Sequence, residues 1–272
     1  MRIAVLMTCH NRKDETMSCL LALYNCILPD TYSLSVYLVD DASTDGTSEY
    51  IRNKYPNIII IEGNGNLFWN RGMHLAWQTA SKNDYDFYLW LNDDTILVNN
   101  AIQGLISNYT SLKNDSILVG TTISKKNGKI TYGGRYKNDD LLMPNGEVQR
   151  CTLFNGNCIL ISKKTFYAVG NLDPYYHHSL GDFDYSKRAI NHNISIYLGS
   201  NIVGFCEEHE SIPAMRNSKV SLSKRIMALY NPLGYNPIEY FHYDHKNENL
   251  SIAILHFITI HFKTIFPKLW KK

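Results

Sequence analysis

The sequence predicts an α/β fold in which helices flank a mostly parallel mixed sheet. Strand-like apolar segments alternate strictly with amphipathic segments over the first half of the chain, which is typical of βαβ units. The chain has 272 residues, of which 44% are apolar, and can therefore bury a sizeable core. Residues 124–150 are polar and rich in turn residues, which indicates hairpins and loops over the sheet.

The strand segments of the first half are short and rich in β-branched and aromatic residues, as strands covered on both faces are. We expect these strands at 3–8, 34–40, 57–61, 86–91 and 116–122. The segments between them carry apolar residues at helical spacing. We expect these helices at 14–27, 43–54, 72–80 and 101–112.

After the polar stretch, two helices and three strands should complete the compact part. We expect strands at 152–162, 194–199 and 202–210, with helices at 163–170 and 182–191. The pattern changes after Arg216, where amphipathic and aromatic segments follow. The chain therefore divides into a domain over residues 1–215 and a helical C-terminal extension over residues 216–272.

The extension contains the apolar segment 250–266, which is followed by Trp270 and a terminal Lys pair. An apolar helix with basic residues at its end fits a membrane interface. The alternative is a helix packed on the domain or on another subunit. Because no run of 18 apolar residues is free of charge, we do not expect a membrane span.

Composition narrows the choice of partners and compartment. The net charge of +2 is too small a bias to indicate nucleic acid. The six cysteines are scattered, with no C-x-x-C pair, which suits a reducing cytosol. The apolar start of the chain is too short for a secretory signal and is better explained as the first strand. These observations predict a cytoplasmic protein, and the extension could place it at the inner face of the plasma membrane.

Polar side chains follow the strand at 86–91, in the triplet Asn92, Asp93 and Asp94. Two carboxylates about 4 Å apart repel by roughly 4 kcal/mol at an effective dielectric near 20, so both stay ionised only with water, donors or a cation. A divalent metal is one explanation. The other is that the triplet opens a turn and caps the following helix.

Two more acids, Asp40 and Asp41, end the second strand within VDDASTDGT. Helix capping explains the Ser and Thr residues after them but not two acids before Ala42. A carboxylate at a parallel strand tip can accept the imide N–H of uracil or thymine, or a ribose hydroxyl.

The first strand ends in TCHNR, which brings Thr8, His10 and Arg12 to the same edge, where Arg12 could offset a phosphate charge. The Gly/Asn-rich loop GNGNLFWNRG at 63–72 permits close backbone approach before a helix N-terminus, which favours anions. It lacks the fingerprints of phosphate-loop and dinucleotide-binding proteins.

Asp182, Asp184 and His209 are the remaining candidates. The two acids lie in GDFDY and could serve simply as first-turn acids of a helix. His209 could equally be a buried, hydrogen-bonded histidine.

Taken in order, TCHNR, VDDASTDGT, GNGNLFWNRG, LWLNDDT and GDFDY resemble the motifs of the bacterial family 2 glycosyltransferases. The similarity runs from Met1 to about Glu210 and includes the subset related to rhamnosyltransferases. It implies the GT-A fold, a Rossmann-like fold of nucleotide-diphospho-sugar transferases. The nucleotide-binding half would be about 1–122 and the acceptor-binding half about 123–215.

The resemblance also implies roles for individual residues. Asp94 would bind Mn²⁺ or Mg²⁺ with His209, and Asp182 would be the general base that deprotonates the acceptor hydroxyl. Asn92 and Gly181 stand where the family usually has acids. The set of metal ligands and the pair of acidic residues that contains the general base are therefore atypical. The implied donor-binding residues are Thr8, His10, Arg12, Asp40, Asp41, Asn66, Asn70, Arg71, Asn92 and Asp93.

The implied reaction is an inverting transfer of a hexose or deoxyhexose from a UDP- or dTDP-sugar. The implied acceptor is a glycan or lipid-linked glycan of cell-surface polysaccharide, such as capsule or O-antigen. A catalytically inactive glycan- or nucleotide-sugar-binding scaffold is the alternative. A sugar nucleotidyltransferase is disfavoured, because TCHNRKDET differs from the glycine-rich motif of those enzymes. The sequence does not define the oligomeric state.

Overall fold

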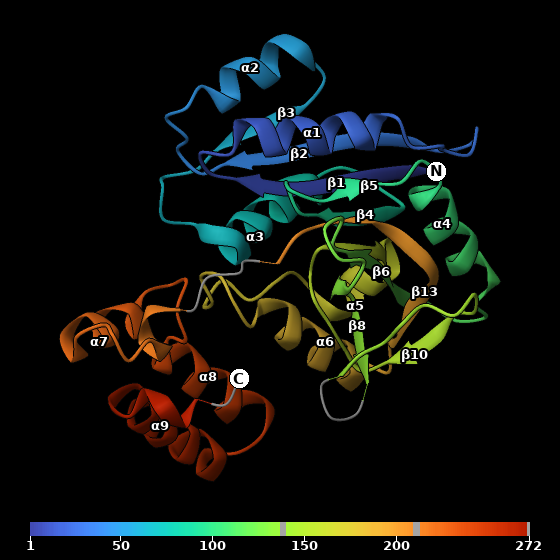
Figure 1. Cartoon of the computed structure of the whole chain (residues 1–272). Coiled ribbons are helices and arrows are strands. Elements are labelled where there is room, and N and C mark those ends of the chain that lie inside the picture. Colours follow the sequence, from blue (N-terminus) through green and yellow to red (C-terminus); the bar gives the residue numbers. More distant parts are fainter. Residues whose placement is uncertain (137–139, 209–212, 271–272) are drawn as a thin grey trace.

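The computed structural model describes residues 1–136, 140–208 and 213–270. Within these ranges the chain forms a large mixed sheet, covered by helices on both faces, and a C-terminal group of helices (Figure 1). The α/β prediction is confirmed. The strands are β1 Arg2–Cys9, β2 Ser33–Asp40, β3 Ile59–Glu62, β4 Phe87–Leu91, β5 Ile96–Leu97, β6 Ser116–Ile123, β7 Ile130–Tyr132, β8 Gly134–Tyr136, β9 Asp140–Leu141, β10 Gln149–Cys151, β11 Leu153–Phe154, β12 Cys158–Ser162 and β13 Ser195–Phe205.

The helices occupy most of the segments with helical periodicity. They are α1 Lys13–Tyr24, α2 Thr47–Lys54, α3 Phe68–Ala80, α4 Ala101–Ser111, α5 Lys163–Val169, α6 Gly181–Asn191, α7 Leu222–Tyr230, α8 Pro237–Asn247 and α9 Leu250–Ile265, with short 3₁₀ turns η1 Ala214–Arg216 and η2 Pro267–Leu269. The expected helix at 43–54 begins only at Thr47, because Gly46 has a left-handed φ of 81°. The strands expected at 194–199 and 202–210 form one strand, β13, which ends at Phe205 and has two register shifts in its pairing with β6.

The large sheet has the strand order β10-β13-β6-β12-β4-β1-β2-β3. Strands β3, β2, β1 and β4 run parallel, while β12 is antiparallel to both of its neighbours, β4 and β6. Because β1, β2 and β4 are parallel, their carboxyl ends lie at the same edge. The polar residues that follow these three strands are therefore brought together, as the α/β prediction requires.

The two faces of the sheet have separate cores, because successive side chains of a strand point to opposite faces. In β4, Leu89 and Leu91 pack with α1 and α4, whereas Tyr88 and Trp90 pack with α3, α5 and α6. The second core is aromatic: the Trp77 ring lies 5.4 Å from that of Trp90. These rigid layers fix the strand ends.

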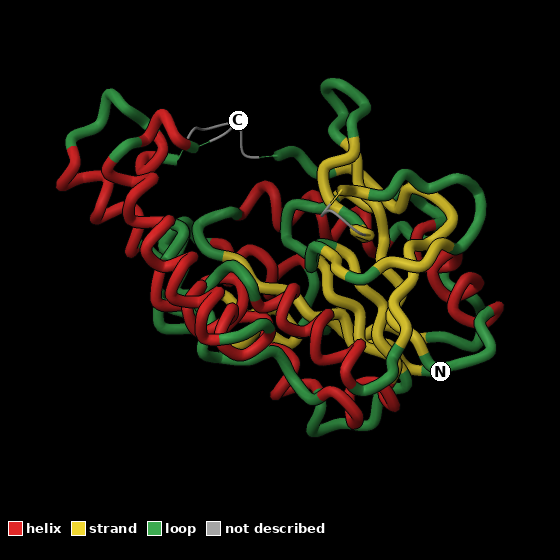
Figure 2. The backbone as a smooth tube through the Cα atoms, turned by 90° about the horizontal axis from the view of Figure 1, so that it is seen from below, coloured by secondary structure: helices red, strands yellow, loops and turns green. Residues whose placement is uncertain are grey.

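The C-terminal helices α7, α8 and α9 form a separate small group that extends away from the strands (Figure 2). Their own core contains Met215, Leu229 and Ile260. Helix α8 connects this group to the domain, since Lys246 Nζ lies 2.8 Å from carboxylate oxygens of both Asp173 and Asp184. Among the described residues, no helix combines the length and apolar character needed to cross a membrane.

Candidate active site

The carboxylates after β4 share one guanidinium. Arg12, just after β1, places Nη1 3.3 Å from Asp93 Oδ1 and Nη2 2.7 Å from Asp94 Oδ2. The Arg12 charge offsets the repulsion that two adjacent acids would otherwise have. The sequence predicted that these residues share an edge, and the structure brings them together.

The two carboxylates have different surroundings. Asp93 is 5% exposed, and burial, opposed by Arg12 and reinforced by Asp94, raises its pKa to about 7. Asp94 is more open, and its Oδ1 accepts a hydrogen bond from the Cys206 thiol at 3.3 Å. Burial and the neighbouring Asp94 raise the pKa of Cys206, so this group is a thiol at neutral pH. Asp94 is therefore the acid that can meet a ligand.

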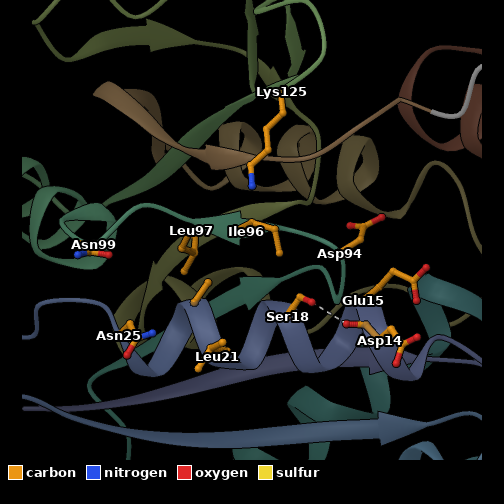
Figure 3. Close-up of a pocket in the computed structure, with 11 residues that line it drawn as sticks. Asp14, Glu15, Ser18, Leu21, Asn25, Asp94, Ile96, Leu97, Asn99 and Lys125 are labelled. Atoms are coloured by element: carbon orange, nitrogen blue, oxygen red, sulfur yellow. Dashed lines mark hydrogen bonds between the residues drawn. The ribbon is translucent and has the colours of Figure 1, made fainter.

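Asp94 lies at one end of an open groove of about 670 Å³ (Figure 3). Asp14 and Glu15 of α1 line the groove near Asp94, and Lys125 points into it from the wall opposite α1. The end of the groove next to Asp94 thus carries several negative charges.

Asp40 and Asp41 shape the loops after β2 in this structure. Asp41 accepts hydrogen bonds from the backbone N–H groups of Gly65 at 2.7 Å and Leu67 at 2.8 Å, and a third from Phe68. Asp40 accepts from the Ser43 N–H and the Ser48 hydroxyl. Both acids are 4% exposed. Their predicted contact with a pyrimidine or ribose stays a prediction.

The other residues expected to bind the donor differ in accessibility. His10 is exposed, and its Nδ1 bonds to the Asp41 carbonyl oxygen at 2.6 Å. Asn66 is also exposed. Thr8 is buried against α3, where a Cβ on Gly72 would lie 2.3 Å from the Thr8 hydroxyl oxygen. Close packing of α3 on β1 thus depends on Gly72.

Asn70 and Arg71 hold the segment that precedes α6. Asn70 is fully buried and donates to the carbonyl oxygens of Asp173 at 2.7 Å and Tyr176 at 2.8 Å. Arg71 Nε donates to the Pro174 carbonyl at 2.9 Å. In this structure both side chains position residues 173–176. Their direct contact with a nucleotide-sugar donor stays a prediction.

Asp182 lies at the start of α6 and is held by backbone donors. Its Oδ2 accepts from the Gly156 N–H at 3.0 Å and its Oδ1 from the Phe183 N–H at 2.9 Å. Burial raises its pKa to about 6, although these hydrogen bonds and Arg135 act in the opposite direction. The side chain keeps partial solvent access. A carboxylate with such a pKa is ionised at neutral pH and can accept a proton.

Trp69 links the Asp182 region to Asn92, the residue before the two acids after β4, and was not singled out from the sequence. Its indole N–H donates to Asn92 Oδ1 at 2.7 Å. Its ring packs on Gly156, where a Cβ would come within 2.5 Å of it and 3.5 Å of the Asp182 Cβ. The turn signal in FNGN, directly before β12, was the available indication that a backbone approaches another group closely here.

His209, the expected second metal ligand, lies outside the described residues. Among the residues that are described, no group of three or more His, Cys, Asp or Glu side chains is arranged to hold a metal ion. Asp94 is therefore the ligand candidate on which the metal prediction depends.

The Glycosyl transferase family 2 sequence model matches residues 4–207, three quarters of this chain. The chain belongs to glycosyltransferase family 2. Among curated proteins, none matches the sequence significantly.

Solved glycosyltransferase structures share the fold of this family 2 chain at low sequence identity. S. aureus TarS residues 1–349 with UDP-GlcNAc gives a TM-score of 0.60 at 15% identity over 100% of this chain and 76% of that one. GalNAc-T7 with UDP, GalNAc and Mn²⁺ gives a TM-score of 0.63 at 14% identity, over 96% of this chain and 54% of that one. The mannosyltransferase PcManGT of Pyrobaculum calidifontis, with GDP-Man and Mn²⁺, gives a TM-score of 0.56 at 14% identity, over 95% of this chain and 73% of that one. This chain spans 46% of the longer S. aureus TarS chain.

The geometry explains why this family 2 chain has glycine at 181. A Cβ there would lie 1.8 Å from Asn70 Oδ1, in a fully buried position. The Asn70 amide thus occupies the space that an acidic side chain at 181 would need.

Replacing Gly181 by Ala should therefore destabilise the fold. Overpacking of this kind costs about 1–3 kcal/mol, which corresponds to a fall in Tm of roughly 2–12 °C for a chain of this size. Thermal melting followed by circular dichroism measures it. The matched control is Gly104→Ala in α4, where an added Cβ meets nothing within 4 Å. Equal melting temperatures for the two variants would contradict the steric explanation.

Proposed function

We propose that this chain is an inverting glycosyltransferase that moves a sugar from a UDP- or dTDP-sugar to a hydroxyl of a glycan or lipid-linked glycan. The observation that carries the proposal is the chain of contacts from Asn92, the residue directly before Asp93 and Asp94, to Asp182. Asn92 bonds to Trp69, Trp69 packs on Gly156, and the Gly156 N–H bonds to Asp182. These contacts support a single site that contains both the proposed donor-binding acids and the proposed general base.

The residues present fit a divalent cation that arrives with the nucleotide diphosphate. Mg²⁺ in nucleotide sites is bound by one or two carboxylates together with substrate phosphates. Asp94 offers a partly exposed carboxylate, and a bound cation would take the place of its contact with Arg12 or with the Cys206 thiol. Asp94 would hold Mn²⁺ or Mg²⁺, with His209 as the proposed second ligand. Such an ion supplies stabilisation for the charge that develops on the leaving diphosphate.

Asp182 would act as the base. A sugar hydroxyl is a poor nucleophile until its proton is taken, and an ionised carboxylate at the site can take it as the new bond forms. The backbone N–H groups of Gly156 and Phe183 orient the carboxylate. Attack from the face opposite the diphosphate inverts the anomeric centre, while Arg12 stabilises negative charge at the donor end.

The biological setting follows from the substrate class. Solved structures with this fold contain UDP-GlcNAc or GDP-Man, which supports a nucleotide-sugar donor without defining the base or the sugar. We propose a cytoplasmic enzyme of cell-surface polysaccharide assembly, such as capsule or O-antigen, because the donor-binding motifs resemble those of such enzymes.

The test is a thermal-shift series with UDP, dTDP, GDP and CMP, each with and without Mn²⁺. A ligand at a hundred times its Kd stabilises the folded state by about 2.7 kcal/mol, which raises Tm measurably. We expect stabilisation by UDP or dTDP that depends on metal. Stabilisation by GDP alone would overturn the donor assignment. Binding without single-turnover sugar transfer, given the matching nucleotide sugar and acceptor, would favour the inactive scaffold.

A further inference from the structure

The last helix of the chain presents an unusual apolar face. In α9 the buried residues Ala253, Ile260 and Thr264 lie on one side, facing the small core of the C-terminal group. At 100° per residue the opposite side carries large apolar residues at intervals of three and four. This apolar face consists of Leu255, Ile258 and Phe262, and the segment directly after α9 adds two more exposed apolar residues, Phe266 and Leu269.

The apolar face is well exposed: Leu255 is 66% exposed, Ile258 60% and Phe262 52%. Helix α9 packs on α8, α7 and the two 3₁₀ turns, all within the C-terminal group. This group extends away from the sheet (Figures 1 and 2). Contiguous apolar surface of this kind marks an interaction site in a folded protein.

Charge indicates which partner the face would meet. Residues 213–272 contain nine Lys and Arg against three Asp and Glu, which gives +6. The preceding 212 residues contain 18 basic and 22 acidic residues, which gives −4. Lys263 follows Phe262 in the last turn of α9, and Lys268 lies in η2 directly after the helix. The positive charge of the chain is therefore concentrated in the group that carries this face.

A second copy of the chain fits this charge distribution poorly. A two-fold dimer through the apolar face would set one +6 group against another, and like charges in close contact oppose association. An anionic lipid surface complements both features, because it attracts Lys and Arg and admits apolar side chains at the headgroup boundary.

We propose that the apolar face of α9, together with the flanking lysines, binds the surface of an anionic membrane with the helix lying in the plane of the interface. The proposal does not rest on the proposed catalytic function. Membrane binding would nevertheless have a consequence for the proposed catalytic function. Helix α8 contacts α9 and is joined through Lys246 to Asp184, two residues from Asp182. Membrane binding through α9 would hold the base-bearing helix near the lipid surface.

The experiment is co-sedimentation of the full chain with phosphatidylcholine vesicles, with and without phosphatidylglycerol. We expect binding only to the anionic vesicles, weakened by salt. The double variant Leu255→Ser, Ile258→Ser should bind the anionic vesicles at least tenfold less tightly, since it removes two large apolar side chains that would be buried at the headgroup boundary. In the double variant Lys263→Glu, Lys268→Glu, each substitution should lower the affinity for anionic vesicles by about fivefold or more.

Matched controls separate this surface from the rest of the molecule. Ile27→Ser, Tyr167→Ser replaces exposed apolar residues elsewhere, and Lys82→Glu, Lys113→Glu reverses exposed lysines of the domain. Both controls should bind vesicles like the parent chain, and all variants should keep its circular dichroism spectrum and melting temperature. No sedimentation with anionic vesicles at low salt would overturn the proposal. So would a dimer in light scattering that Leu255→Ser, Ile258→Ser dissociates, because a second copy would then cover the face.

Discussion

Replacing Asp182 by Asn should lower kcat by about 10²–10⁴, the contribution that a positioned general base makes to proton transfer. Asparagine keeps the size of the side chain and one oxygen acceptor for the Gly156 or Phe183 N–H, but it cannot take the proton of the acceptor hydroxyl. The proposed nucleotide-binding residues Asp93 and Asp94, on the other side of Trp69, should be unaffected. Steady-state kinetics with nucleotide and metal titrations should therefore show a loss in kcat with an unchanged Kd for the nucleotide.

The pH profile distinguishes this role from a structural one. Asp182 must be ionised to accept a proton, and burial raises its pKa to about 6. The kcat/KM of the parent enzyme should therefore fall as the pH decreases through about 6 and level off above it. The residual activity of Asp182→Asn should lack this acid limb. Asp93 titrates in the same range because burial raises its pKa to about 7, so a limb that persists in Asp182→Asn would assign it to Asp93 instead.

The control for Asp182→Asn is Asp30→Asn, which changes an exposed acid remote from the site. It should have the kinetics of the parent enzyme. If Asp182→Asn also turned over normally at pH 8, another group would have to accept the proton, and the assignment of Asp182 as base would be wrong.

Sequence periodicity predicted the fold well because it reports which faces of each element are buried. The continuous apolar runs in DFYLWL and IAVLMT require cover on both faces of a sheet, and β4 and β1 have it. Parallel β1, β2 and β4 then follow, and they bring Arg12 to the acids after β4. The order of strands and helices in a sequence therefore predicts which residues meet at the carboxyl edge of the sheet.

Individual roles at that edge were harder to predict, because a polar residue at a strand tip has the same local pattern whether its partner is a ligand or the backbone. Asp41 receives three N–H groups from a loop more than twenty residues away. Asn70 supports carbonyl groups about a hundred residues away. Trp69 itself gave no signal, since an aromatic residue in a helix usually belongs to the core, and the turn in FNGN indicates a close approach without naming the partner. Such partners depend on tertiary packing, which local patterns do not encode.

Replacing Asp94 by Asn should remove metal-dependent nucleotide binding and lower turnover by about 10³ or more. An ion that neutralises a leaving diphosphate contributes several kcal/mol to the transition state, and each 1.36 kcal/mol corresponds to a factor of ten in rate. Asparagine can still accept a hydrogen bond from Arg12, so the guanidinium is not left without a partner at this position. The change therefore removes mainly the negative charge that would bind a cation.

Calorimetric titration with UDP or dTDP, with and without Mn²⁺, measures this effect directly. The matched control is Glu15→Gln, which neutralises an exposed acid of the same groove next to Asp94. If the field of the acidic groove alone attracted the metal, both variants would weaken binding similarly, because exposed charges act additively and are screened by salt. If Asp94 coordinates the ion, Glu15→Gln should bind like the parent enzyme and only Asp94→Asn should lose the metal dependence. Retention of that dependence in Asp94→Asn would instead place the metal on other ligands.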